Sequence, residues 1–304
     1  MLNYLKLTRP INLLLIALVQ VLIKYSLFEP FDAVTSLSNL HFSLLVIATV
    51  CIAAGGNIIN DIYDAEVDRI NKPKKVIVGK AISERNASTL YVMLTTVGVG
   101  IGFYLANTIG KPVYTTLFIG IAALLYLYAT YLKTILLAGT VLVSILVAMS
   151  IIIVGLFDLV PVINLSNQAS QWDVFKISLE YALFAFILNF IRELVKDLQD
   201  INGDKNGGKS TLPIAIGRSR ATTVVFALGA ITTLSVIAYM YVFLYAYTSA
   251  ILYFLFLVVA PLLFFCIKSF EAEKTKHYAL LSLLLKIIMF TGMCSMMLYP
   301  FVIL

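Results

Sequence analysis

Residues 135–157 read I-L-L-A-G-T-V-L-V-S-I-L-V-A-M-S-I-I-I-V-G-L-F, without one charged side chain. A helix needs about 20 apolar residues to cross the hydrocarbon core of a bilayer, so this stretch is long enough to span a membrane. The rest of the chain has the same character, since 61% of its 304 residues are hydrophobic and only 12% are charged. This composition predicts an integral membrane protein, because soluble domains are far less apolar.

Eight more apolar stretches of similar length lie on either side of this one, separated by charges, Pro, Gly and Asn. The nine expected spans cover residues 10–28, 39–59, 86–106, 112–130, 134–157, 176–196, 220–244, 249–268 and 278–302. We therefore expect an all-α bundle of nine membrane helices around a central cavity. The longest connections, about 60–85 and 197–219, are too short to form a soluble core. The sequence predicts one membrane domain over residues 1–304, with two Asp-rich loops.

The distribution of Lys and Arg predicts the orientation of the spans. Of the 22 basic residues, 18 lie on one side of the expected membrane, and Lys24, Lys111 and Lys176 lie on the other. Positive charge is retained in the cytoplasm. We therefore expect a cytoplasmic N-terminus and both Asp-rich loops on the cytoplasmic face.

Lys286 is the one basic residue well inside an expected span, about 12 Å along the helix from its cytoplasmic start. A charge that faces lipid at such a depth is unfavourable by about 2.5–3.5 kcal/mol. Its side chain therefore either lines a cavity or extends toward the interface. The sequence leaves both alternatives open.

Two acidic segments end expected helices and share one spacing. They read N-D-I-Y-D-A-E-V-D over residues 60–68 and E-L-V-K-D-L-Q-D-I-N-G-D over residues 193–204. Each contains three Asp residues separated by three and then four positions: Asp61, Asp64 and Asp68 in the first, and Asp197, Asp200 and Asp204 in the second.

On a helix this spacing places the carboxylates on one face, where they repel unless cations lie among them. Basic residues follow both segments, and carboxylates beside Lys and Arg are the groups that bind a complex of Mg²⁺ with a diphosphate. Solvated helix ends are the alternative interpretation, but such ends usually mix Lys with Glu. The pattern favours a metal-diphosphate site.

These motifs resemble those of the UbiA-type intramembrane prenyltransferases. The segment at residues 60–68 is similar to that family's N-D-x-x-D-x-x-x-D motif, with its N-K-P run at residues 71–73. The segment R-E-L-V-K-D-L-Q-D-I-N-G-D-K at residues 192–205 resembles the family's other Asp-rich motif, with T-L-P at residues 211–213. The stretches Y-A-T-Y-L-K (128–133) and L-T-R-P (7–10) are similar to two further family motifs. One departure is Lys75-Val76, where many members have R-P, which removes a two-pronged phosphate contact.

The resemblance implies a Mg²⁺-dependent enzyme that moves a prenyl group, expected to be geranylgeranyl, from its diphosphate to a lipophilic acceptor. The implied metal ligands are Asn60, Asp61, Asp64, Asp68, Asp197, Asp200 and Asp204. The implied catalytic residues among them are Asp64, Asp68, Asp197, Asp200 and Asp204. Arg9, Lys75, Lys133 and Lys196 are implied to bind the diphosphate, and Asn189 and Glu193 to contact the acceptor.

The Asp-rich motif at residues 193–204 is most similar to that of the members that prenylate geranylgeranylglyceryl phosphate. The basic residues of the two loops exceed what one diphosphate requires, which fits an acceptor with its own phosphate. Ring prenylation of an aromatic quinone precursor is the alternative. A transporter of divalent cations or organic anions is a more distant one, because the acids end helices on one face only.

The expected setting is the cell membrane of a bacterium or an archaeon, with the active site facing the cytoplasm. The expected partners are the prenyl diphosphate donor, the acceptor and membrane lipids. Nucleic acid is excluded as a partner by this apolar composition.

Overall fold

The computed structural model describes residues 2–71, 73 and 76–303. Within these residues, one isolated bridge between Val78 and Ile82 is the only β pairing, and the rest of the regular structure is helical. Nine helical segments of the described chain are long and apolar enough to cross a membrane. The predicted all-α membrane bundle is thereby confirmed.

The membrane helices keep close to the spans that the sequence predicts. They are α2 (Pro10–Leu22), which continues as a π-helix over Ile23–Phe28, α3 (Asn39–Tyr63), α5 (Glu84–Thr108), α6 (Thr115–Thr130), α7 (Ala138–Asp158), α8 (Gln168–Asn206), α10 (Arg218–Phe243), α11 (Thr248–Phe254), which leads through a π-helix over Leu255–Val259 into α12 (Ala260–Phe270), and α13 (Thr275–Cys294). The short helices α1 (Leu2–Leu7), α4 (Ala65–Asn71) and α9 (Leu212–Ile216) lie between them in the chain.

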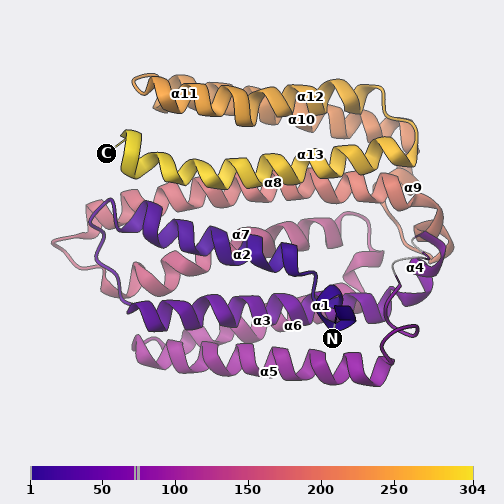
Figure 1. The fold of residues 1–304 in the computed structure, drawn as a ribbon, viewed down its shortest axis with the longest axis horizontal. Helices are drawn as coiled ribbons and strands as arrows, with labels where there is room; N and C mark the ends of the chain where they lie inside the picture. Colours follow the sequence, from indigo (N-terminus) through magenta and orange to yellow (C-terminus); the bar gives the residue numbers. More distant parts are fainter. Residues whose placement is uncertain (1, 72, 74–75, 304) are drawn as a thin grey trace.

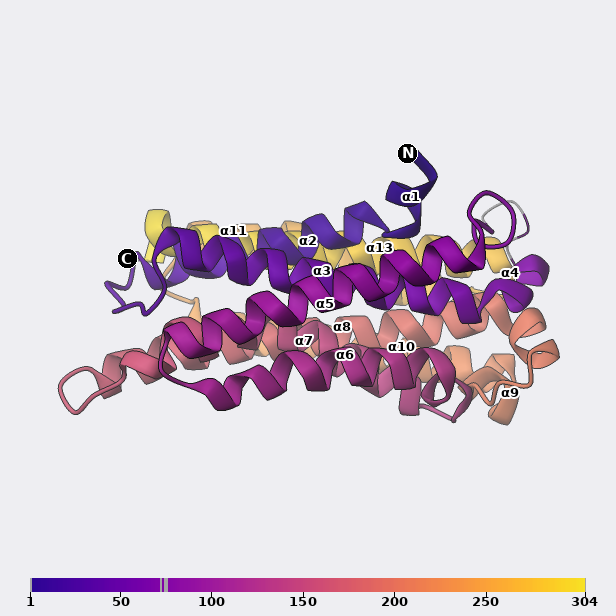
Figure 2. The ribbon, with the colours of Figure 1, turned by 90° about the horizontal axis from the view of Figure 1, so that it is seen from below.

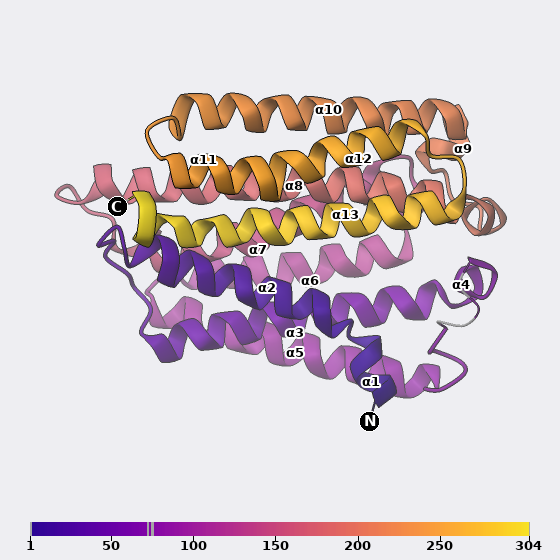
Figure 3. The ribbon, with the colours of Figure 1, turned by 45° about the horizontal axis from the view of Figure 1, so that its top comes forward.

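The membrane helices run side by side along the longest axis of the molecule (Figure 1). Helices α10, α11 and α12 form one edge, α3, α5 and α6 form the opposite edge, and α2, α7, α8 and α13 lie between them (Figures 1 and 3). Helices α4 and α9 lie at one end of the bundle, whereas the C-terminus lies at the other end (Figures 1 and 2). Both Asp-rich segments therefore share one end.

Helix α8 corrects the expected boundary of one loop. The hydropathy pattern predicts an end near residue 196, but the helix has 39 residues and continues to Asn206. At 1.5 Å per residue such a helix is about 58 Å long, which exceeds the thickness of the hydrocarbon core. Its charged last turns extend beyond the membrane, so the segment 197–206 is helical rather than part of a loop.

Tight packing of the helices depends on small residues at close approaches. At Gly98 of α5, an added Cβ would lie 2.6 Å from Cγ1 of Ile52 and 2.9 Å from the backbone oxygen of Ala48. Because such distances are shorter than a van der Waals contact, only glycine lets α3 and α5 approach this closely. Small residues serve membrane helices in this way, since lipid provides no hydrophobic driving force between them.

A buried ion pair lies at the end of the bundle opposite the Asp-rich segments. The Lys24 ammonium is 2.9 Å from Oδ2 of Asp158 and donates a hydrogen bond of 2.9 Å to the carbonyl oxygen of Leu37. The backbone N–H of Leu37 donates to Oδ1 of Asp158 at 2.7 Å. Lys24 is only 2% exposed, and its ion pair with Asp158 ties the π-helix to α7.

Candidate active site

The two Asp-rich segments meet where the end of α8 packs against α4. The Lys209 ammonium lies 3.2 Å from Oδ1 of Asp64 and 3.2 Å from Oδ1 of Asp204. The Lys133 ammonium, from the short helix Leu132–Thr134, lies 2.9 Å from the same Asp64 oxygen. Lys209 thus joins two acidic segments that are far apart in the chain, and Lys133 adds a second positive charge to the first of them.

Asn60 completes the surroundings of Asp64. Its Nδ2 donates to Oδ2 of Asp64 at 2.9 Å, and its Oδ1 accepts a hydrogen bond of 3.3 Å from Lys133. Burial raises the pKa of the Asp64 carboxyl, but the charges of Lys209 and Lys133 outweigh it and hold the pKa below its ordinary value. Asp64 is therefore ionised at neutral pH.

The two lysines respond differently to the same surroundings. Burial lowers the pKa of the Lys133 ammonium, and the nearby Asp64 only partly offsets this effect. At Lys209 burial also lowers the pKa, but Asp64 and Asp204 together outweigh it, so the net shift is upward. Lys209 is the more firmly protonated of the two, because it bridges two carboxylates.

Arg9 forms a salt bridge with Asp61 beside this cluster. It precedes Pro10 at the break between α1 and α2. Its backbone φ of 56° lies in the left-handed region, which residues other than glycine rarely adopt. Burial lowers the pKa of its guanidinium, and the Asp61 carboxylate more than compensates. The break between the helices thus holds a charged guanidinium next to the first Asp-rich segment.

Further polar residues lie on α8, deeper in the bundle. Glu193 is 2.7 Å from the Lys196 ammonium and 3.4 Å from the Arg192 guanidinium. One turn further from the Asp-rich end, Asn189 donates a hydrogen bond of 3.3 Å to Oγ of Ser144 on α7. The predicted acceptor residues thus lie on the side of the Asp cluster that faces the bundle interior.

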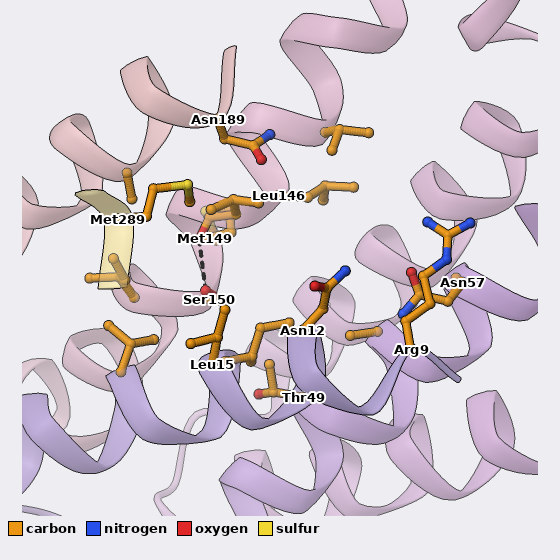
Figure 4. A pocket seen from close by; sticks show the side chains of 18 of the residues that line it. Arg9, Asn12, Leu15, Thr49, Asn57, Leu146, Met149, Ser150, Asn189 and Met289 are labelled. Atoms are coloured by element: carbon orange, nitrogen blue, oxygen red, sulfur yellow. Dashed lines mark hydrogen bonds between the residues drawn. The ribbon is translucent and has the colours of Figure 1, made fainter. Parts of the chain in front are cut away.

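A cavity of about 300 Å³ extends from this polar group into the bundle. Its polar walls include Arg9, Asn57, Asn60, Glu193 and Lys196, and its apolar walls include Leu15, Leu146, Met149, Met289 and Phe290. Figure 4 shows Asn12 of α2 and Asn189 of α8 on opposite walls, with Arg9 and Asn57 together at one side. The cavity is therefore a mostly apolar chamber with a charged group at one end.

A smaller cavity of about 50 Å³ adjoins the larger one. Tyr128 and Glu193 line both cavities, whereas Asp197, Asp204 and Lys209 line the smaller one. Eight of the predicted site residues thus line one or both of these neighbouring cavities, whereas Asp61 and Asp64 lie beside them. Lys75 lies outside the described residues, and Asp68 and Asp200 each interact with neighbouring groups.

The chemistry of the described donor groups suits a divalent cation, although their present arrangement does not form a complete metal site. In the part of the chain that the structure describes, no group of three or more His, Cys, Asp and Glu side chains is arranged to hold a metal ion. Instead, the Lys209 ammonium lies between the carboxylates of Asp64 and Asp204, so this place already holds a positive charge. Carboxylate oxygens, with the amide oxygen of Asn60 nearby, are the hard ligands that Mg²⁺ prefers.

The sequence alone does not assign several residues of these walls. Its pattern places Lys209 among surplus basic residues, although this lysine bridges the two Asp-rich segments. The sequence analysis assigns no role to Asn12 or to Arg192, although Arg192 is the first residue of the second Asp-rich motif, and both line the large cavity. The spacing of the sequence could have identified Arg192, because it lies four residues before Lys196 and therefore on the same face of the helix as this predicted site residue.

Comparisons with known proteins agree in both sequence and fold. The model of the UbiA prenyltransferase family matches residues 31–287. A digeranylgeranylglyceryl phosphate synthase from Korarchaeum cryptofilum (strain OPF8) is 31% identical over 271 residues, which cover 88% of this chain and 88% of that protein. A solved UbiA homologue from Aeropyrum pernix K1 has a TM-score of 0.65 at 15% identity and covers 94% of each chain.

A further solved structure shares the fold and contains ligands. It is a UbiA homologue from Archaeoglobus fulgidus bound to GPP and Mg²⁺, with a TM-score of 0.54 at 20% identity. The match covers 97% of this chain and 99% of that one.

Proposed function

The chain belongs to the UbiA prenyltransferase family, and from this membership we propose that it transfers a geranylgeranyl group from geranylgeranyl diphosphate to a hydroxyl of geranylgeranylglyceryl phosphate. The enzyme is a prenyltransferase and an integral membrane protein of archaeal type. One observation carries the proposal: a mostly apolar cavity opens beside the place where two Asp-rich segments meet. A long prenyl chain with a charged head requires both features.

The basic residues at the cavity mouth bind the leaving group in this proposal. Arg9, Lys133, Lys196 and Lys209 lie where they can contact the diphosphate oxygens. When the allylic C–O bond breaks, its electron pair stays on the diphosphate, which gains one negative charge. Cationic groups bind this product-like state more strongly than the ester, so they lower the barrier.

The Asp-rich segments are proposed to hold Mg²⁺, with residues 1–304 acting as one domain. The ligands would come from Asn60, Asp61, Asp64, Asp68, Asp197, Asp200 and Asp204, and the bound metal would supply further positive charge to the leaving diphosphate. The chain's own walls keep water away from the allylic cation, because Leu15, Leu146 and Met289 surround its path.

The acceptor oxygen then attacks the allylic carbon and loses its proton. Among the described residues, Glu193 is the one carboxylate that lines the large cavity. Its Oε1 accepts from Lys196 and Arg192, which keeps the carboxylate oriented toward the junction of the two cavities. We assign Glu193 as the group that takes the proton.

The proposed acceptor is tested with the purified protein in detergent, Mg²⁺ and geranylgeranyl diphosphate. Geranylgeranylglyceryl phosphate, hydroxybenzoate and dihydroxynaphthoate are supplied in parallel, and products are identified by mass spectrometry. We expect an ether-linked product from the glyceryl phosphate and none from the aromatic acids. Prenylation of the aromatic acids alone would contradict the proposal and favour quinone biosynthesis.

The active site is proposed to face the cytoplasm, from the distribution of basic residues. In a variant whose Cys51, Cys266 and Cys294 are replaced by Ser, Asn206→Cys tests this orientation. We expect a membrane-impermeant thiol reagent to label it only after the cells are opened. Leu165→Cys is the matched control, because Leu165 is 91% exposed in the connection at the other end and is expected to react in intact cells. The reverse labelling pattern would show that the site faces outward.

A further inference from the structure

The Lys286 side chain forms part of the wall of the large cavity. It lies on α13, and its ammonium donates a hydrogen bond of 2.7 Å to Oδ1 of Asn12 on α2. Both side chains line the cavity. Of the two alternatives that the sequence leaves open, the structure therefore favours a lysine that lines a cavity.

Arg192 belongs to the same wall. It lies on α8, against which α13 packs, and its side chain is 17% exposed. One nitrogen of its guanidinium contacts Glu193 at 3.4 Å, but its Nε is buried and has no hydrogen-bond partner among the described residues. A buried donor without a partner is unfavourable, so this nitrogen is available for a ligand.

The charges on this wall do not balance. Arg192 and Lys196 share the single carboxylate of Glu193, and no carboxylate of the described chain lies within 4 Å of the Lys286 ammonium. The proposed diphosphate site already uses Lys196, which also makes the shorter contact with Glu193, so Arg192 and Lys286 remain as two positive groups for a further anion. The excess of about two positive charges matches a phosphate monoester, which carries about −1.5 to −2 charges at neutral pH.

The position of this group also separates it from the diphosphate site. Arg192 precedes Asp197 by five residues on one helix, which places it about 7.5 Å deeper in the bundle. The basic residues that line the large cavity are Arg9, Arg192, Lys196 and Lys286, whereas Lys133 and Lys209 line the smaller cavity. Because Arg9 and Lys196 are already assigned to the diphosphate, a second anion in the large cavity would meet Arg192 and Lys286.

We propose that Lys286, Arg192 and Asn12 form a subsite that binds the phosphate of the acceptor. The inference rests on the proposed function, since it assigns the place in the same cavity where a phosphorylated acceptor is recognised. A phosphate held there leaves the acceptor hydroxyl between Arg192 and the Asp-rich end of α8, near Glu193. The subsite therefore selects acceptors by their phosphate and orients them toward the donor.

The test compares geranylgeranylglyceryl phosphate with geranylgeranylglycerol, its dephosphorylated form, as acceptors for the purified enzyme. The variants are Lys286→Met, Lys286→Gln, which retains a hydrogen-bond donor without the charge, and Lys286→Arg. A charge-assisted hydrogen bond stabilises a complex enough to change affinity about 10- to 100-fold. For each variant we compare kcat/KM for the phosphorylated acceptor with kcat/KM for the dephosphorylated one. We expect Lys286→Met and Lys286→Gln to lower the ratio of these two values by this factor. The change lies in the acceptor KM, while the donor KM stays within about twofold and Lys286→Arg restores the ratio.

Lys276→Met is the matched control, because Lys276 is exposed near the start of the same helix and is expected to leave both acceptors unaffected. If the wild-type enzyme uses the phosphorylated acceptor and the Lys286 variants keep its kcat/KM ratio, the subsite is wrong while the proposed function stands. If the wild-type enzyme prenylates neither glycerol derivative, both proposals are wrong.

Discussion

We expect Asp64→Asn and Asp200→Asn each to lower kcat at least about 100-fold, because each removes a charge that organises the site around the leaving diphosphate. The pKa of Asp64 is held below its ordinary value by Lys209 and Lys133, so its carboxylate is charged under assay conditions and the substitution removes a real charge. We also expect EDTA to abolish activity and added Mg²⁺ to restore it. Single-turnover measurement of diphosphate release reports the chemical step directly.

Asp173→Asn is the matched control for these variants. Asp173 pairs with Lys176 at 3.0 Å on the surface of α8, where its side chain is 69% exposed. We expect this variant to keep wild-type activity, because exposed ion pairs of this kind contribute little. Full activity of the enzyme in EDTA, or of either site variant, would refute the metal-diphosphate site.

Another large effect is expected at Lys24, far from the reaction. Lys24→Met leaves the Asp158 carboxylate buried without its cation, which destabilises a protein by about 3–5 kcal/mol. We expect a pronounced decrease in the Tm of the purified protein, measured as thermal unfolding monitored by fluorescence. Adding Asp158→Asn is expected to recover most of the loss, because a neutral amide oxygen still accepts the hydrogen bond from Leu37.

Lys176→Met provides the comparison, since it breaks an exposed pair and is expected to change stability by less than about 1 kcal/mol. A Lys24→Met variant as stable as Lys176→Met would show that the buried pair does not fix the end of the bundle.

The spans were predictable because the thickness of a bilayer sets the length of an apolar stretch. Among the described residues, eight of the nine spans agree with the expected bounds to within five residues at both ends. The exception is α8, which begins at Gln168 rather than at 176 and continues to Asn206 although the charged residues past position 196 indicated a loop. A helix does not end where it leaves the hydrocarbon, and hydropathy reports only the membrane part of it.

The position of both Asp-rich segments at one end of the bundle was predictable from the distribution of Lys and Arg, but the contacts between the segments were not. Apolar residues face lipid and the bundle interior alike, so periodicity does not identify the side of a helix that lines a cavity. The bond between Asn12 and Lys286 joins residues 274 positions apart, and Lys24 pairs with a partner 134 positions away. Such pairs depend on how the helices pack, which no local pattern encodes.

The lysine bridges of the active site also affect what happens between turnovers. Lys133 and Lys209 neutralise Asp64 and Asp204. If the diphosphate binds here as proposed, its entry is an exchange of counterions rather than the burial of new charge. We expect the same ion pairs to re-form as diphosphate departs and to offset the loss of its contacts. The side chains of the proposed site would then compete with the product, which favours rapid recycling and weak product inhibition.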